Sequence, residues 1–153
     1  MKEPDDYYKI LELAIAREVE AYNFYLALAD RVESQEIRKA FEDLAKEELE
    51  HKAKLELEVM KTGKTVVVEE KPLRPERSYI LSDDESPLDM DYKDMLLLAM
   101  EKEEAAFRIY VNLAASAQDE ESREVLLAIA EEEVKHKLRF ETEYYLLLKE
   151  QTE

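Results

Sequence analysis

The chain repeats itself: when it is shifted by 85 residues, its first half falls onto its second half. The chemically distinctive residues that coincide are Glu18 with Glu103, Tyr25 with Tyr110, Glu48 with Glu133, and His51 with His136. The chain contains only two histidines, and both take part in the repeat. From this duplication we predict that two equivalent halves pack together about a pseudo-twofold axis.

Each half is predicted to consist of two long helices. The 153 residues include one Gly and four Pro, and they are rich in Glu, Leu, Ala and Lys, which are strong helix formers. Apolar residues recur with the helical period in four stretches. The predicted helices span about residues 6–31, 35–62, 91–117 and 119–149. Ser34 is the predicted N-cap of the second helix, and Gly63 is its predicted C-terminal stop.

Residues 63–90 form a predicted crossover between the second and third helices, because they hold three of the four prolines. The other two connections are short, which makes the helices that they join antiparallel neighbours. A long crossover can return the chain along the bundle, so that the second and third helices run in the same direction. We therefore predict one domain over residues 1–153, an all-α, ferritin-like four-helix bundle with one long crossover. Residues 66–68 favour a short strand whose partner the sequence does not identify.

Composition excludes several classes of function. The formal net charge of −17 disfavours binding to nucleic acid or to an anionic membrane, because both are negatively charged. With no cysteine, the chain cannot form a disulfide, a zinc–thiolate site or an iron–sulfur cluster. The N-terminal residues lack the apolar core of a signal peptide, and no apolar run reaches 18 residues. These features predict a cytoplasmic protein.

The repeated acidic residues and histidines have the spacing of metal ligands. Residues three apart lie on one face of a helix, so Glu48 and His51 offer an oxygen and a nitrogen to one cation, as do their repeat partners. Glu18 lies two turns from Tyr25, on a stripe that faces the core. A carboxylate is costly to bury unless it is paired or bound to metal. Two divalent cations would balance the charge of four such carboxylates. The predicted ligands are Glu18, Glu48, His51, Glu103, Glu133 and His136.

Other interpretations of these residues stay open. Glu47 and Glu132 each lie four residues before a histidine, so either could replace its neighbour as the ligand, although Glu48 and Glu133 are preferred. Glu20 is a weaker rival to Glu18, because Ala105 occupies the equivalent position in the second half. A Glu-x-x-His pair on its own could also be a solvated surface pair.

The two repeated tyrosines have two interpretations of equal weight. Tyr25 and Tyr110 are either aromatic core residues or partners whose hydroxyls bond the ligand carboxylates. In the second case, they would hold the ligands in place from outside the metal site.

The motifs together resemble the rubrerythrin branch of the ferritin-like di-iron carboxylate proteins. The matching segments are Glu18-Val-Glu-Ala-Tyr-Asn-Phe-Tyr25, Glu48-Leu-Glu-His51, Glu103-Glu-Ala-Ala-Phe-Arg-Ile-Tyr110 and Glu133-Val-Lys-His136. The resemblance implies two iron ions, with Glu18 and Glu103 as terminal ligands, Glu48 and Glu133 as bridges, and the two histidines as terminal nitrogen ligands. Manganese can use similar ligands.

The resemblance implies a redox function, with two departures from the family pattern. Full-length rubrerythrins carry a cysteine-ligated rubredoxin domain, whereas this chain has no cysteine and would need an external electron donor. They also carry an additional Glu at the position of Ala106, so a simpler six-ligand centre is expected here. The leading hypothesis is reduction of peroxide or dioxygen. The alternatives are a ferroxidase that sequesters iron and a non-enzymatic metal-binding bundle. The family also implies a homodimer.

Overall fold

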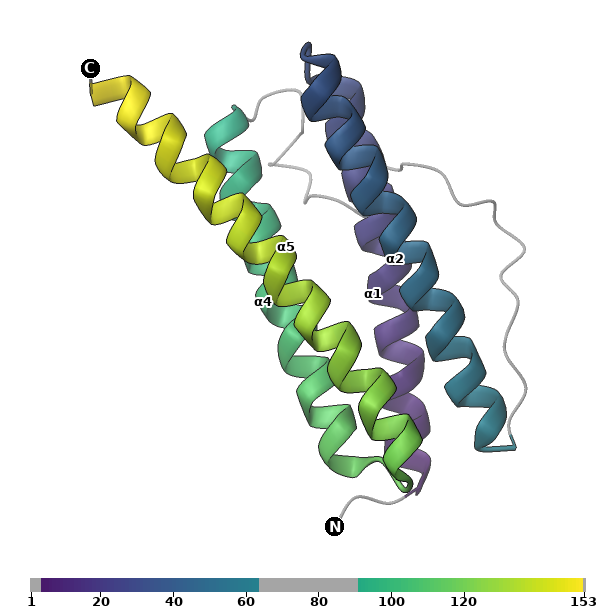
Figure 1. Cartoon of the computed structure of the whole chain (residues 1–153). Coiled ribbons are helices and arrows are strands. Elements are labelled where there is room, and N and C mark those ends of the chain that lie inside the picture. Colours follow the sequence, from purple (N-terminus) through teal and green to yellow (C-terminus); the bar gives the residue numbers. More distant parts are fainter. Residues whose placement is uncertain (1–3, 64–90, 153) are drawn as a thin grey trace.

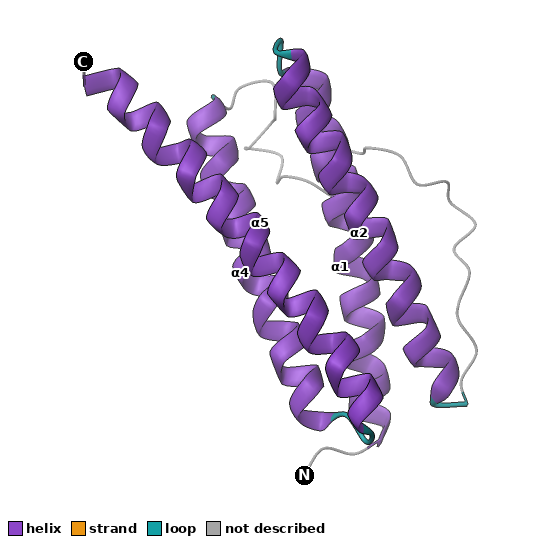
Figure 2. Ribbon diagram, in the orientation of Figure 1, coloured by secondary structure: helices purple, strands orange, loops and turns teal. Residues whose placement is uncertain are grey.

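The computed structural model describes residues 4–63 and 91–152, and this part of the chain forms four helices without a strand. Their bounds are α1 Pro4–Arg31, α2 Gln35–Lys61, α4 Tyr92–Ser116 and α5 Glu120–Thr152 (Figures 1 and 2). The predicted crossover after Gly63 and the predicted strand at residues 66–68 lie outside the described residues.

Local hydrogen bonds set the ends of these helices. Ser34, Asp91 and Asp119 each accept a bond from the backbone N–H three residues later, at 3.3, 2.8 and 2.7 Å. This is the pattern of an N-cap, which satisfies an N–H group that the first helical turn leaves unpaired. Gly63 ends α2 with a φ of 83°, the left-handed conformation that glycine adopts without strain. The predicted cap at Ser34 and the predicted stop at Gly63 are therefore confirmed.

The helices form two antiparallel hairpins, α1 with α2 and α4 with α5, as Figure 1 shows. In the same view α2 and α4 run in the same direction, from the upper to the lower end of the bundle. Helices within a hairpin pack closely along their length. Between the hairpins, α1 packs more extensively on α4 than α2 does on α5. The all-α, ferritin-like fold is thereby confirmed, with the two repeated halves as its two hairpins.

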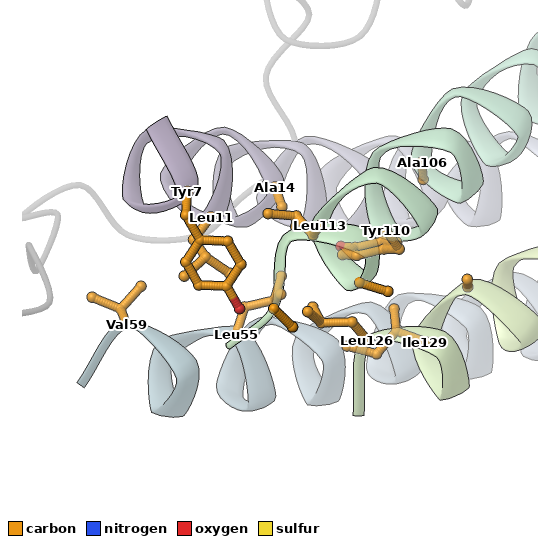
Figure 3. Packing of buried hydrophobic residues seen from close by; sticks show 13 residues of the cluster. Tyr7, Leu11, Ala14, Leu55, Val59, Ala106, Tyr110, Leu113, Leu126 and Ile129 are labelled. Carbon is orange, nitrogen blue, oxygen red and sulfur yellow. The ribbon is translucent and has the colours of Figure 1, made fainter. Parts of the chain in front are cut away.

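The apolar core is divided into two clusters along the bundle. One is built around Leu11, Leu55, Leu113, Leu126 and Ile129 (Figure 3). The other is built around Phe24, Leu28, Phe41, Leu96 and Phe140. Burying one such side chain contributes about 1.5–3 kcal/mol relative to leaving it exposed. The free energy gained by burying the two clusters can therefore offset the cost of burying a layer of polar residues between them.

Lysine side chains tie the hairpins to each other on two sides of the bundle. The Lys61 ammonium, at the end of α2, donates to the Ser122 hydroxyl near the start of α5 at 2.7 Å. On the other side of the bundle, the Lys102 ammonium of α4 donates to Glu20 of α1 at 2.7 Å. No helix among the described residues is both long enough and apolar enough to cross a membrane.

Candidate metal centre

A layer of buried carboxylates and imidazoles separates the two apolar clusters. It contains all the residues that the repeat marked as ligands, and none is more than 5% exposed. Each hairpin supplies three of them. The layer consists of Glu18 from α1, Glu48 and His51 from α2, Glu103 from α4, and Glu133 and His136 from α5.

The six side chains form two overlapping groups. In each group, one ligand atom per residue lies within 4.8 Å of all the others. The first group is Glu18, Glu48, His51 and Glu133, and the second is Glu48, Glu103, Glu133 and His136. Glu48 and Glu133 belong to both groups, which is the arrangement that two neighbouring cations with bridging carboxylates require. The imidazole rings of His51 and His136 are stacked, with their centroids 6.3 Å apart.

Each of the six residues also presents one buried atom that has no hydrogen-bond partner among the described residues. These atoms are Glu18 Oε2, Glu48 Oε1, His51 Nδ1, Glu103 Oε2, Glu133 Oε1 and His136 Nδ1. An unpaired buried polar atom ordinarily costs about 1–3 kcal/mol, and six in one layer demand an explanation. A pair of divalent cations supplies it, because carboxylate oxygens and imidazole nitrogens together suit iron and manganese. The residues present thus fit a dinuclear metal centre.

Each of the two repeated tyrosines donates a hydrogen bond to a buried carboxylate of the opposite hairpin. The Tyr25 hydroxyl donates to Glu103 Oε1, and the Tyr110 hydroxyl donates to Glu18 Oε1. Burial, followed by the negative charge of the carboxylate that it contacts, raises the pKa of each tyrosine well above its usual range. Each hydroxyl therefore stays protonated and keeps donating. Tyr25 also stacks on Phe41 and Phe140, so it is a core aromatic and a carboxylate partner at once.

The rival ligands lie outside the layer. The side chains of Glu47 and Glu132 are 44% and 38% exposed. Glu47 contacts His136 Nε2 at 3.2 Å, and Glu132 contacts His51 Nε2, so each touches the ring nitrogen that faces away from the carboxylate layer. Glu20 pairs with Lys102 instead. The geometry favours Glu48 and Glu133 as the inner residues.

These outer contacts were missed by the sequence reasoning, which treated Glu47 and Glu132 only as substitutes for their neighbours. A signal for them was present, because both halves contain Glu-Glu-x-x-His rather than Glu-x-x-His alone. Their partners are on the opposite hairpin, and the spacing within one helix does not identify such a contact.

Protons take the place of cations in the metal-free layer. Burial raises the pKa of Glu133 to about 8, with a further contribution from the charge of Glu103. Burial and the charges of Glu18 and Glu133 raise the pKa of Glu48. Burial opposes protonation of His51 and His136, but their contacts with the layer's carboxylates outweigh it and raise both pKa values. The metal-free layer therefore retains protons at neutral pH.

We expect the stability of the metal-free protein to fall as the pH rises from about 4.5 to about 8. The pKa of Glu133 is raised from 4.5 to about 8 on folding, so the folded state binds the extra proton. That stabilisation is complete below the unfolded pKa and is lost as the pH passes through the folded pKa. The raised histidine pKa values act with the same sign. Urea unfolding of chelator-treated protein between pH 5 and pH 9 measures the effect, and a constant or rising stability would contradict it.

Comparison with known proteins shows relatives of this chain in sequence and in structure. A family model described as Rubrerythrin matches residues 9–144. A solved structure of a hypothetical protein from Pyrococcus furiosus is 29% identical, with a TM-score of 0.75, over 94% of this chain and 90% of that one. No match was found among curated proteins. The family match includes parts of all four helices and every residue of the buried layer.

Proposed function

The chain belongs to the rubrerythrin family, and from this premise we propose that it reduces peroxide or dioxygen at a dinuclear iron centre. The proposal depends on one observation: six possible metal-ligand atoms have no hydrogen-bond partner among the described residues, and their residues form two groups that share Glu48 and Glu133. A purely structural layer would need no such sharing, whereas a two-electron reaction uses two metal ions held side by side.

In this proposal each residue has a defined part. Glu18 and His51 would hold one ion, Glu103 and His136 would hold the other, and Glu48 and Glu133 would bridge them. When bound, two ferrous ions supply the two electrons that convert peroxide, with two protons, into two molecules of water. The chain supplies the geometry, because each carboxylate and imidazole projects from a helix whose packing restricts its movement.

The chain's other residues control water and substrate. The apolar clusters on both sides exclude bulk water along the bundle axis, with Leu55 and Ile129 on one side and Phe41 and Phe140 on the other. The remaining approach is between α2 and α5, which pack on each other less than the other neighbouring helices do. In this proposal a small oxidant, peroxide or dioxygen, reaches the centre from that side.

Electrons for the next turnover must come from elsewhere. These 153 residues contain no cysteine, so they hold neither a rubredoxin-type centre nor a reducing thiol. An external electron donor is therefore part of the proposal. A homodimer and a cytoplasmic location are further parts of it, as is the possibility that manganese replaces one or both iron ions.

The test is rapid mixing of anaerobic protein, loaded with two ferrous ions per chain, with hydrogen peroxide or with dioxygen. We expect ferrous iron to be oxidised much faster than the same concentration of free ferrous ion, and the faster oxidant identifies the substrate. The variant Glu48→Ala should lose the acceleration, because it removes a shared ligand. The matched control Glu50→Ala changes an exposed residue of the same helix and should react as the wild type does. A wild-type rate no faster than that of free iron would refute the proposal.

A second candidate, iron oxidation followed by storage, has one observation in its favour. Ala106 is buried three residues after Glu103, at the position where full-length rubrerythrins carry an additional Glu. That Glu is associated with the peroxidases of the family, so the six-ligand centre left without it favours a reaction other than peroxide reduction. Storage requires a closed shell of many subunits that retains far more than two ferric ions per chain. A mass measurement in solution, followed by iron analysis after repeated oxidation, distinguishes it from the leading proposal. Metal-dependent stability with no oxidation of ferrous iron would instead indicate a non-enzymatic metal-binding bundle.

A further inference from the structure

The two imidazole rings are oriented in the same way relative to the buried layer. His51 Nδ1 lies 3.3 Å from Glu48 Oε1, 3.3 Å from Glu133 Oε1 and 3.6 Å from Glu18 Oε2. The ring's other nitrogen, Nε2, points the opposite way and contacts the carboxylate of Glu132. The inner nitrogen therefore faces the place where the first group of ligand atoms converges.

His136 repeats this arrangement from the other hairpin. Its Nδ1 lies 3.3 Å from Glu103 Oε2 and 3.6 Å from Glu133 Oε1. Its Nε2 lies 3.2 Å from Glu47 Oε2. Both inner nitrogens lack a hydrogen-bond partner among the described residues, and both outer nitrogens have an acidic one. The same orientation therefore recurs in both halves of the repeat, with an acidic side chain of the other hairpin at each outer nitrogen.

A neutral imidazole carries its proton on one nitrogen only, and the nitrogen that binds a metal must be the bare one. When bound cations neutralise the inner carboxylates and the ring is neutral, its proton belongs on Nε2, because the carboxylate beside Nε2 can only accept. The lone pair of Nδ1 is then directed into the layer. Metal-binding histidines commonly have such a carboxylate behind the ring, where it fixes the tautomer and increases the basicity of the ligand nitrogen.

We propose that Glu47 and Glu132 are positioning residues that hold His136 and His51 as Nε2–H tautomers, so that Nδ1 of each ring binds the metal. The inference rests on the proposed dinuclear centre and deepens it. It extends the functional motif of each half to Glu-Glu-x-x-His, in which the first Glu acts on the histidine of the other half.

The crossing of these contacts has a structural consequence. Glu47 is on α2 and reaches α5, while Glu132 is on α5 and reaches α2. These two helices otherwise pack loosely. Each hairpin thus completes the metal-binding histidine of its partner hairpin, and correct docking of the two halves becomes a condition for tight binding at both ions.

The test uses Co²⁺ binding to the metal-free full chain, followed by the visible absorption of the bound ion. We expect Glu47→Ala and Glu132→Ala each to weaken binding by about 10- to 100-fold. The matched controls are Glu50→Ala and Glu131→Ala, which remove the same charge from exposed positions of the same two helices. The controls should weaken binding far less. Equal losses of Co²⁺ affinity in the positioning variants and the controls would overturn the proposal, because the change in net charge alone would then account for the weaker binding.

Two further measurements separate positioning from a merely structural role. Glu47→Gln and Glu132→Gln keep the shape of the side chain and an oxygen that accepts from Nε2–H, so they should restore most of the affinity that the Ala variants lose. In ¹⁵N-detected NMR of the Zn²⁺-loaded protein, both histidines should carry a proton on Nε2 and metal on Nδ1. Metal on Nε2 of either ring would overturn the proposal for that ring.

These outcomes are independent of the redox proposal, because Co²⁺ and Zn²⁺ binding involves no oxidant. Slow peroxide reduction with the predicted tautomers would refute only the proposed reaction. Fast peroxide reduction, with Glu47→Ala and Glu132→Ala binding Co²⁺ as tightly as their controls, would refute only the positioning role.

Discussion

Anaerobic loading with two ferrous ions per chain is expected to raise the midpoint of thermal unfolding by on the order of 10 °C at neutral pH. A ligand that binds only the folded state, present at a thousand times its Kd, stabilises by about 4 kcal/mol. For a chain of this size, each kcal/mol shifts the midpoint by about 2–4 °C. The physical source is the buried layer, whose oxygen and nitrogen atoms without a hydrogen-bond partner would become ligands of the bound cations. Differential scanning calorimetry of chelated and reloaded protein measures the shift.

Magnesium is the matched control for this experiment. Mg²⁺ carries the same charge but prefers an all-oxygen shell, so the two imidazoles make the site unsuitable for it. It should raise the midpoint far less than ferrous ion at the same concentration. A ferrous shift as small as the magnesium shift would mean that the layer is not a metal centre, and the proposed function would fall with it.

The substitution Glu133→Gln is expected to stabilise the metal-free protein while it abolishes binding of the metal pair. Burial and the charge of Glu103 disfavour the ionised form of Glu133. Gln removes that charge and keeps the shape of the side chain. Each unit by which burial raises a carboxyl pKa corresponds to about 1.4 kcal/mol against the ionised form, so Gln relieves this cost in the pH range where Glu133 would be ionised. With a pKa of about 8, Glu133 is largely protonated at pH 7, so the gain should be larger at pH 9.

Urea unfolding of the metal-free variant at pH 7 and pH 9 measures the expected change in stability, and a Co²⁺ titration measures the expected loss of metal binding. The matched control Glu131→Gln changes a side chain that is 71% exposed, and it should alter the unfolding free energy by no more than about 0.5 kcal/mol. A Glu133→Gln variant that is less stable at pH 9, or that binds two ions as the wild type does, would contradict the assignment of Glu133 as a shared ligand. Opposite effects on stability and on binding are typical of residues kept for function.

The sequence alone determined the features that arise from local interactions. Helical periodicity and the shortage of Gly and Pro predicted four helices, because helix formation depends on residue preferences and on backbone hydrogen bonds between residues four apart. The side-chain oxygen of Ser34 and the conformational freedom of Gly63 marked the two ends of α2 for equally local reasons. The internal repeat added the candidate ligands, since it paired the only two histidines with acidic residues at matching positions.

The tertiary structure decided which neighbour of each acidic pair is buried. Glu47 and Glu48 are consecutive, so they point about 100° apart around the helix axis, and both can approach a histidine. Only the packing of α2 against the other helices places Glu48 in the layer and leaves Glu47 partly in solvent. Glu132 and Glu133 are divided in the same way, because the same packing recurs in the second hairpin.

The tertiary structure also decided every contact between the hairpins. Tyr25 bonds Glu103, Tyr110 bonds Glu18, and Glu47 reaches His136, although these partners lie 78, 92 and 89 positions apart in the sequence. No local rule relates such residues, because their distance depends on how the two halves dock. The sequence therefore identified which residues could bind metal, and the docking of the hairpins determined which atoms face the centre and which side chains hold them there.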